Sequence, residues 1–136
     1  MERSNIAEFR KAVWKFYKAQ GRHALPWRQT RDPYRILVSE VMLQQTQVER
    51  VIGFYEAFMK AFPTTDALSK AALSEVLAEW QGLGYNRRAK NLHAAAKAIA
   101  ELRSFPKTIE AIEALPGAGH YTARAVAAFA HNHDSI

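Results

Sequence analysis

The chain has 136 residues, of which 49% are hydrophobic and 24% charged, and it contains no cysteine. These values are typical of one globular domain, which at this length can bury about two-thirds of the surface of the unfolded chain. The lack of cysteine excludes disulfides, thiolate metal sites and a cysteine nucleophile within these residues. A polar start and the lack of any apolar run near about 20 residues predict neither a signal peptide nor a membrane anchor, so we expect a cytoplasmic protein.

Charge is the first feature that points to a partner. The formal net charge is +6 and the isoelectric point about 9.8, a surplus of cations that favours a polyanionic partner. Two segments are richest in cations: residues 1–28 carry seven Lys or Arg against two Glu, and residues 87–107 carry six against one. Charge patterning alone fits a pair of solvated helix faces equally well.

Helix-breaking residues are few and lie mostly between periodic segments, which predicts an all-α fold of seven or eight short helices. The first helix is predicted from about Ile6 to Ala19 and is followed by a loop that ends at Arg28. Asp32 and Pro33 are typical of an N-cap and a first helical position, so a second, apolar and central helix should begin there.

The third helix is predicted to begin with Thr46 to Glu49, which fits a capping box, and to run to Lys60. The pair Gln44 and Gln45 then lies where the second helix ends. Residues 63–66 are predicted to cap a short fourth helix. The helices that follow are predicted from Ser74 to Trp80, from Asn86 to Leu102 with Leu92, Ala95, Ile99 and Leu102 facing inward, from Thr108 onward, and from Tyr121 to Ala130.

The segment between the last two helices carries the most chemical information. Leu115 to Ala123 reads LPGAGHYTA, in which Gly117 and Gly119 permit positive φ and a close backbone approach. The amides from Gly117 to Tyr121 would then point outward at a helix N-terminus, where such groups bind phosphate without base preference. A bare Gly-X-Gly is also common in tight turns between helices, so the glycines alone leave both interpretations open.

The whole string, L-P-G-x-G-x-x-T, resembles the helix-hairpin-helix element of DNA repair proteins. Four further motifs follow the spacing of the same family, and together they make the chain similar to the adenine DNA glycosylases of the helix-hairpin-helix superfamily. These enzymes remove adenine mispaired with guanine or 8-oxoguanine. The resemblance spans about Trp14 to Ala130 and implies an all-α, six-helix barrel domain. The four motifs are LPWR from Leu25, DPY from Asp32, SEVMLQQTQV from Ser39, and GLGY from Gly82 followed by RRAKNL from Arg87.

The resemblance also implies a domain organisation. Residues 1–24 would form an N-terminal helix and linker, and residues 25–136 the six-helix barrel domain, with the helix-hairpin-helix at about 109–130. The chain is expected to be partial, because the family's second carboxylate, an Asp, would fall about three residues beyond Ile136 and the second helical domain is truncated. No cofactor is expected within this chain, whereas full-length relatives often carry a 4Fe-4S cluster in the part beyond it.

Glu40 lies among apolar residues of the second predicted helix, where burial of a carboxylate should raise its pKa. A raised pKa suits a general acid, although a glutamate at the core edge paired with Arg or Lys is an open alternative from chemistry alone. The resemblance assigns Glu40 as the acid that protonates the adenine ring as the glycosidic bond breaks. It places Tyr121 at the reacting sugar, where bifunctional relatives carry a lysine, and so implies no strong lyase step.

Further residues take roles from the same resemblance. Trp27, Arg28 and Leu43 would line the base pocket, and Gln45 and Tyr85 would form the wedge that fills the gap left by the extruded base. From the residues alone, Trp27 is equally explained as a surface ring beneath an arginine stem, and Tyr85 as a small core plug. Contacts to the DNA backbone are predicted from Gly117, Gly119, His120, Thr122, Arg87, Arg88 and Lys90.

Gln44 and Gln45 favour the adenine type over the thymine or uracil mismatch glycosylases of the same superfamily. We expect a nucleoid-associated monomer whose partner is double-stranded DNA with a mispaired adenine, and we expect neither a metal site nor a membrane partner. Two other classes stay open. The lack of the second carboxylate fits a non-catalytic helix-hairpin-helix DNA-binding module, whereas a helical protein-interaction bundle would leave the hairpin and the surplus charge unexplained.

Overall fold

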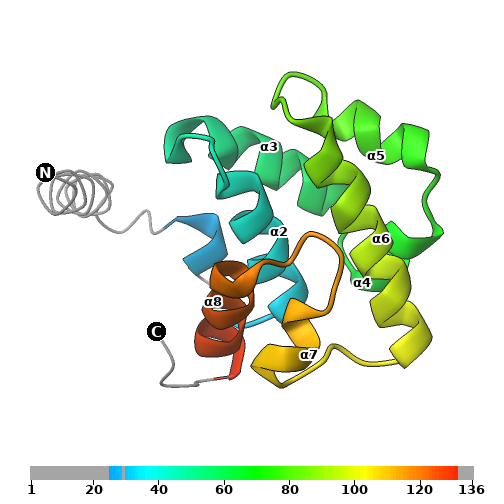
Figure 1. Cartoon of the computed structure of the whole chain (residues 1–136). Coiled ribbons are helices and arrows are strands. Elements are labelled where there is room, and N and C mark those ends of the chain that lie inside the picture. The colour runs from blue at the N-terminus through cyan, green and yellow to red at the C-terminus, as the bar shows by residue number, and fades with distance from the viewer. Residues whose placement is uncertain (1–24, 29, 132–136) are drawn as a thin grey trace, which may run out of the picture.

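The computed structural model describes residues 25–28 and 30–131, and every regular element in that part is helical (Figure 1). The predicted all-α fold is therefore confirmed, while the predicted first helix from about Ile6 to Ala19 lies outside the described residues. Within this part, no helix has the length and apolar character needed to cross a membrane. The elements are the 3-10 helix η1 (Pro26–Arg28), α2 (Pro33–Leu43), α3 (Val48–Ala61), α4 (Thr65–Lys70), α5 (Leu73–Trp80), α6 (Asn86–Leu102), α7 (Ile109–Glu113) and α8 (His120–His131).

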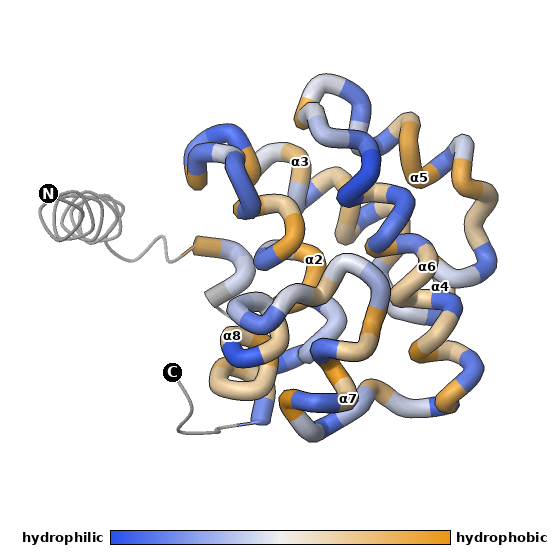
Figure 2. The backbone as a smooth tube through the Cα atoms, viewed as in Figure 1, coloured by the Kyte–Doolittle hydropathy of each residue, from blue (hydrophilic) through white to orange (hydrophobic). Residues whose placement is uncertain are grey.

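Helix α2 is the centre of the core and packs against α3, α6 and α8. Its sequence is apolar on nearly every side, and the hydrophobic colours along it in Figure 2 show this. The helix begins as predicted, because the side chain of Asp32 accepts a hydrogen bond of 3.0 Å from the amide of Tyr34, with Pro33 at the first position. Its buried side chains are Tyr34, Ile36, Leu37, Val38, Ser39, Val41 and Met42.

Aromatic rings fill the space between α3 and α5. Phe58 lies edge-on to both Phe62 and Trp80, with ring centroids 5.0 and 5.9 Å apart. The buried ring of His93 on α6 reaches the carbonyl of Ala71 through Nε2 at 2.8 Å, so this polar group is satisfied inside the core.

Helices α2 and α6 run in opposite directions, so the start of each lies near the end of the other. Asp32 and Tyr34, at the start of α2, line one cavity together with Ile99 and Arg103 near the end of α6. At the other end, Arg88 in the first turn of α6 bonds to carbonyls in the last turn of α2. The functional residues predicted above concentrate at this second end.

The structure corrects several local predictions. Thr46 is not part of a capping box, because α3 begins at Val48 after Gln47, which makes no side-chain cap. Leu102 was predicted to face inward but is 59% exposed, since it is the last residue of α6. Smaller shifts affect α5, which begins at Leu73, and α8, which runs from His120 to His131. Boundaries shift by a residue because caps, rather than apolar periodicity, determine where a helix stops.

Candidate active site and nucleic-acid interface

The turn between α7 and α8 is built around Gly117. Its φ is +76°, and an added Cβ would lie 2.7 Å from the Cβ of Asn91 on α6. The Cβ of Asn91 is fixed to the backbone of α6, so any side chain at position 117 would force a shift and be strained. The predicted positive φ is thus confirmed at Gly117, and the turn is held against the first half of α6.

Gly119 behaves differently from Gly117. Its φ is not positive, so the conformational freedom that glycine permits is not used here, and a Cβ added there would meet nothing within 4 Å. Packing of the protein itself therefore does not require glycine at this position. The carbonyl of Gly119 accepts the amide of Ala123 at 2.9 Å, so α8 starts here, and the first amides of the helix lack partners within the helix. An outside acceptor can approach them closely.

His120 and Thr122 follow in the first turn of α8, and their side chains differ. The ring of His120 is exposed, with Nδ1 3.2 Å from the carboxylate of Glu113. Thr122 is buried, and its hydroxyl accepts a hydrogen bond of 3.1 Å from Nε2 of Gln44. The side chain of Thr122 therefore links α8 to the turn after α2, and the DNA contact at this position stays a prediction.

The connection between α5 and α6, at the top of Figure 1, presents Tyr85 to the outside. Gly82 and Gly84 have φ of +95° and +90° and let the chain reverse. The indole of Trp80 donates to the carbonyl of Gly84 at 3.0 Å, and Arg50 donates to the carbonyl of Gly82. Tyr85 is 62% exposed, so it is not a core plug, and its φ of +55° is rare for a residue with a side chain.

Gln45 has the same unusual backbone conformation in the turn between α2 and α3. Its φ is +60° and the residue is exposed. Arg88 bridges this turn to Tyr85, because its guanidinium donates to carbonyls of both connections and to Thr46. The two predicted wedge residues therefore belong to two turns that one side chain joins.

Three turns thus meet at one edge of the molecule. We call this the three-turn edge, defined by residues 44–46, 84–85 and 117–119. Gln44 bonds to the hairpin helix through Thr122, Arg88 ties residues 44–46 to residue 84, and Gly117 sits against Asn91. Figure 2 shows hydrophilic residues in the α2–α3 turn and along the start of α6, as expected of a face that meets a polar partner.

Cations lie beside this edge on α6. Arg87 and Lys90 are exposed in its first two turns, consistent with the predicted contacts to a phosphate backbone. The third predicted cation, Arg88, points inward instead, and burial lowers the pKa of its guanidinium below the ordinary value. The prediction of a DNA backbone contact is wrong for Arg88, because protein oxygens occupy both terminal nitrogens of its guanidinium.

The predicted acid lies on the helix that ends at the three-turn edge. Glu40 is half-buried in α2, one turn before the exit at Gln44, and Leu43 next to that exit is also half-buried. Tyr121 is 78% exposed at the start of α8, directly before the residue that Gln44 binds. Because α2 and α8 pack side by side, the structure brings the helices carrying these predicted residues together.

Trp27 and Arg28 lie in η1, not in an irregular loop. Trp27 is only 5% exposed and meets the ring of Tyr55 edge-on at 5.4 Å, so it is not a surface ring. The side chain of Arg28 lies outside the described residues.

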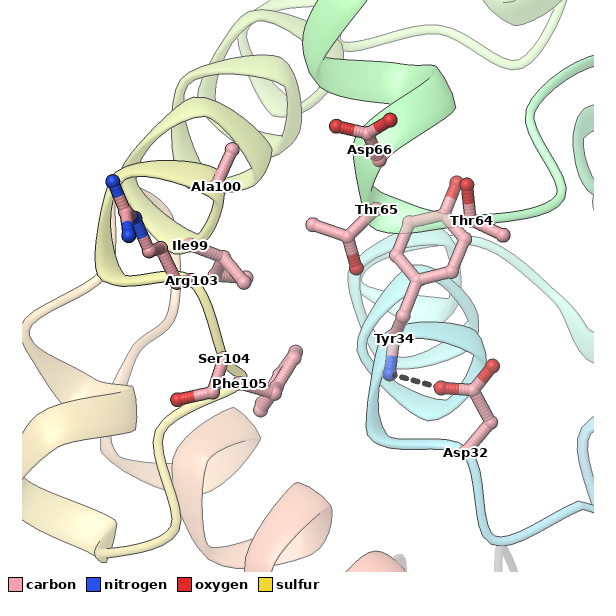
Figure 3. Close-up of a pocket in the computed structure, with 10 residues that line it drawn as sticks. All are labelled: Asp32, Tyr34, Thr64, Thr65, Asp66, Ile99, Ala100, Arg103, Ser104 and Phe105. Atoms are coloured by element: carbon pink, nitrogen blue, oxygen red, sulfur yellow. Dashed lines mark hydrogen bonds between the residues drawn. The ribbon is translucent and has the colours of Figure 1, made fainter.

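A cavity of about 430 Å³ lies away from all of these residues (Figure 3). None of the predicted catalytic, pocket or wedge residues lines it. Its walls come from the starts of α2 and α4 and the end of α6, and include Asp32, Asp66 and Arg103.

Potential metal ligands are scattered over the described part of the chain. No three His, Asp or Glu side chains gather as ligands in residues 25–28 and 30–131, and the sequence has no cysteine. The iron–sulfur cluster that the resemblance implies for longer relatives therefore does not fit the residues described, because such clusters bind through cysteine thiolates.

Sequence reasoning missed the residues that hold the edge together. Gln44 and Thr46 both make contacts across more than 40 positions in the chain, to Thr122 and Arg88. The only signal was their position in the gap between two predicted helices, where a polar side chain can reach a neighbouring element.

The fold and the edge define the class of protein. The family model "HhH-GPD superfamily base excision DNA repair protein" matches residues 38–134, and the chain belongs to this family. The curated relatives it resembles are adenine DNA glycosylases: one from Buchnera aphidicola is 41% identical over 91% of this chain, and one from Mycobacterium tuberculosis 47% over 79%. The human enzyme is 39% identical over 93% of this chain.

Solved structures agree with this assignment of the fold. A thermostable thymine-DNA glycosylase superposes with a TM-score of 0.78 at 30% identity, covering 96% of this chain and 61% of that one. An endonuclease III–DNA complex superposes with a TM-score of 0.74 at 20% identity, covering 96% and 62%. The chain spans 36%, 36% and 25% of the Buchnera, Mycobacterium and human relatives, so their whole activity does not transfer to it directly.

Proposed function

We propose that this chain is the DNA-binding and acid-bearing part of a glycosylase that removes adenine mispaired with guanine or 8-oxoguanine from double-stranded DNA. The observation that carries the proposal is the three-turn edge, where segments far apart in sequence meet at the end of the helix that holds Glu40. The choice of adenine over thymine is supported by the identities, 36–47% to adenine DNA glycosylases and 30% to the thymine enzyme.

Binding comes first in this proposal. The first amides of α8 and the exposed cations Arg87 and Lys90 hold the phosphate backbone without reading sequence. Tyr85 and Gln45 project from the edge and enter the duplex where the adenine leaves it. Extrusion of a base costs a few kcal/mol, and less for a mispaired one, so inserted side chains offset part of the cost.

Glu40 then supplies the proton. The carboxylic acid protonates a ring nitrogen of the extruded adenine, and the electron pair of the C1′–N9 bond leaves with the base. Water adds to the resulting oxocarbenium ion and loses a proton, which yields free adenine and an abasic site. Tyr121 has a phenol and no amine, so no imine forms at the sugar and the strand stays intact.

Release of adenine is the direct test. The assay uses this chain extended to the length of its curated relatives, because the chain spans only 25–36% of their length. We expect free adenine from duplexes with adenine opposite guanine or 8-oxoguanine, and no thymine from thymine opposite guanine. Tight DNA binding without release of any base would instead favour the non-catalytic module.

The absence of strand cleavage is tested separately. With Tyr121 in place, borohydride should trap no protein–DNA adduct, and strands should break only after alkali. Tyr121→Lys should give some trapped adduct, because an amine then reaches the sugar. A trapped adduct of equal yield from the natural chain would show that another amine acts.

A further inference from the structure

Arg88 makes an unusual set of contacts for a residue in the first turn of a helix. Its Nη1 donates to the carbonyls of Val41 and Met42, both at 3.0 Å, and to that of Gln44. Its Nη2 donates to the hydroxyl of Thr46 at 3.0 Å and to the carbonyl of Gly84 at 3.3 Å. One side chain therefore bonds to two connections that lie about 40 residues apart in sequence.

A cation near the last carbonyls of a helix is common, because those carbonyls lack partners within the helix and carry its negative dipole end. Capping of α2 explains the bonds to Val41 and Met42, but not those to Thr46 and Gly84, which belong to the turns beyond. The planar fork of arginine can satisfy several such acceptors in fixed directions, which a lysine cannot do.

The two turns joined by Arg88 are those in which a residue other than glycine has left-handed backbone at the three-turn edge. Gln45 and Tyr85 have φ of +60° and +55°, a conformation that is strained for a residue with a Cβ. Such conformations persist where surrounding contacts determine them. The guanidinium supplies those contacts, and its carbon also lies 5.3 Å from the Tyr85 ring and 5.7 Å from the buried Trp80 ring.

We propose that Arg88 is a positioning residue that holds Gln45 and Tyr85 in register, so that both side chains enter the duplex together. The role rests on the proposed function, because it assumes that these two residues replace an extruded base. Arg88 itself touches neither the base nor the phosphates. Its loss should therefore leave DNA binding in place and weaken the opening of the duplex.

The test compares Arg88→Gln and Arg88→Lys with Lys97→Gln, which removes an exposed cation from the same helix. Binding is measured with a duplex that carries 2-aminopurine at the adenine position, whose fluorescence rises when the base leaves the stack. At saturating protein we expect the fluorescence rise to fall about tenfold in both Arg88 variants, and affinity for a fully paired duplex to change less than about threefold. Lys97→Gln should resemble the natural chain in fluorescence.

Hydrogen exchange of the free chain measures, without DNA, whether Arg88 stabilises the turn that contains Thr46. The amide of Thr46 bonds to the carbonyl of Leu43, and its exchange should accelerate about tenfold in Arg88→Gln, although the substitution is on another helix. Thr46→Val provides a second variant that removes one acceptor of Arg88 and leaves the arginine itself in place, in case Arg88→Gln does not fold. We expect it to lower the fluorescence rise about threefold.

The outcomes distinguish failure of the proposed base extrusion from failure of the positioning role of Arg88. A natural chain that binds the duplex with no rise in fluorescence contradicts base extrusion, and the role of Arg88 with it. A rise that persists unchanged in Arg88→Lys and Thr46→Val overturns the positioning role alone and leaves the proposed function intact. Loss of fluorescence together with an equal loss of affinity for the paired duplex would show that Arg88 only maintains the fold, which also overturns the proposal.

Discussion

Helices α2 and α6 connect two ends of the molecule that use the same backbone conformation differently. At the cavity end, lined by Asp32, Asp66 and Arg103, the left-handed residue is Arg103, the C-cap of α6. A left-handed residue there is a common way to finish a helix. At the three-turn edge, Tyr85 is the N-cap of α6, a position that normally has extended backbone. Strain at a helix start has no such local explanation, and it points to function.

The two ends also differ in shape. The cavity end has a pocket of about 430 Å³, and a hollow of about 510 Å³ lies beside Gly84 at the other end. Only the second end also projects exposed tyrosines among the described residues, Tyr85 at the three-turn edge and Tyr121 in the first turn of α8. A partner as large as a DNA duplex does not need a closed cavity on one small helical unit. Projecting side chains whose turns are held by internal hydrogen bonds suit it better, so the cavity at the far end is a poor guide to the site in this molecule.

Removal of the proposed acid should give the largest effect at the edge. In the extended chain, Glu40→Gln keeps the shape and volume of the side chain but cannot donate the proton, so adenine release should fall by about 10²- to 10⁴-fold or more. Single-turnover release measures the chemical step, and duplex affinity should change little. Glu49→Gln, the same change at an exposed position of α3, is the control and should release adenine normally. Retention of most activity in Glu40→Gln would refute the assignment.

Substitutions of the two hairpin glycines should affect different quantities, stability at Gly117 and DNA affinity at Gly119. Gly117→Ala forces a side chain into a left-handed backbone and against Asn91, and should lower the free energy of unfolding by roughly 2–3 kcal/mol. Gly119→Ala meets no neighbour, so its cost should stay at about 0.5–1 kcal/mol, while its methyl group hinders phosphate and lowers duplex affinity about tenfold. Denaturant unfolding and DNA titration measure the two quantities. Equal losses of unfolding free energy in the two variants would contradict the difference in packing between Gly117 and Gly119.

Much of the architecture could be predicted from the sequence, because its signals are local. Asp32, Thr64 and Thr108 cap helices as expected from residue type, and α6 has its predicted bounds from Asn86 to Leu102. The inward turn of Arg88 and the burial of Thr122 could not be predicted in this way. Both depend on partners more than 40 positions away, and a cation or a hydroxyl in the first turn of a helix is usually exposed.

At the cavity end, substitutions should affect stability and leave DNA binding alone. Asp32→Ala removes the N-cap of α2 and should cost about 1 kcal/mol of unfolding free energy. Asp32→Asn is the matched control, because it loses the same charge and keeps an oxygen that accepts the amide of Tyr34. Thermal unfolding should rank the natural chain and Asp32→Asn above Asp32→Ala, with the same duplex affinity for both variants. A lower affinity in Asp32→Ala alone would mean that the two ends are coupled.

The smallest expected effect concerns the exposed cations. If Arg87 contacts a phosphate, Arg87→Gln should reduce the slope of log affinity against log salt concentration by about one unit, since each neutralised phosphate releases counterions. Lys70→Gln removes an equal charge from α4, where the ammonium lies 3.0 Å from Asp66 of the cavity lining, and should leave the slope unchanged. Titrations of a paired duplex at several salt concentrations give both slopes. Equal slopes for both variants would mean that only net charge attracts the DNA, whereas a smaller slope for Arg87→Gln alone would place the backbone at the three-turn edge.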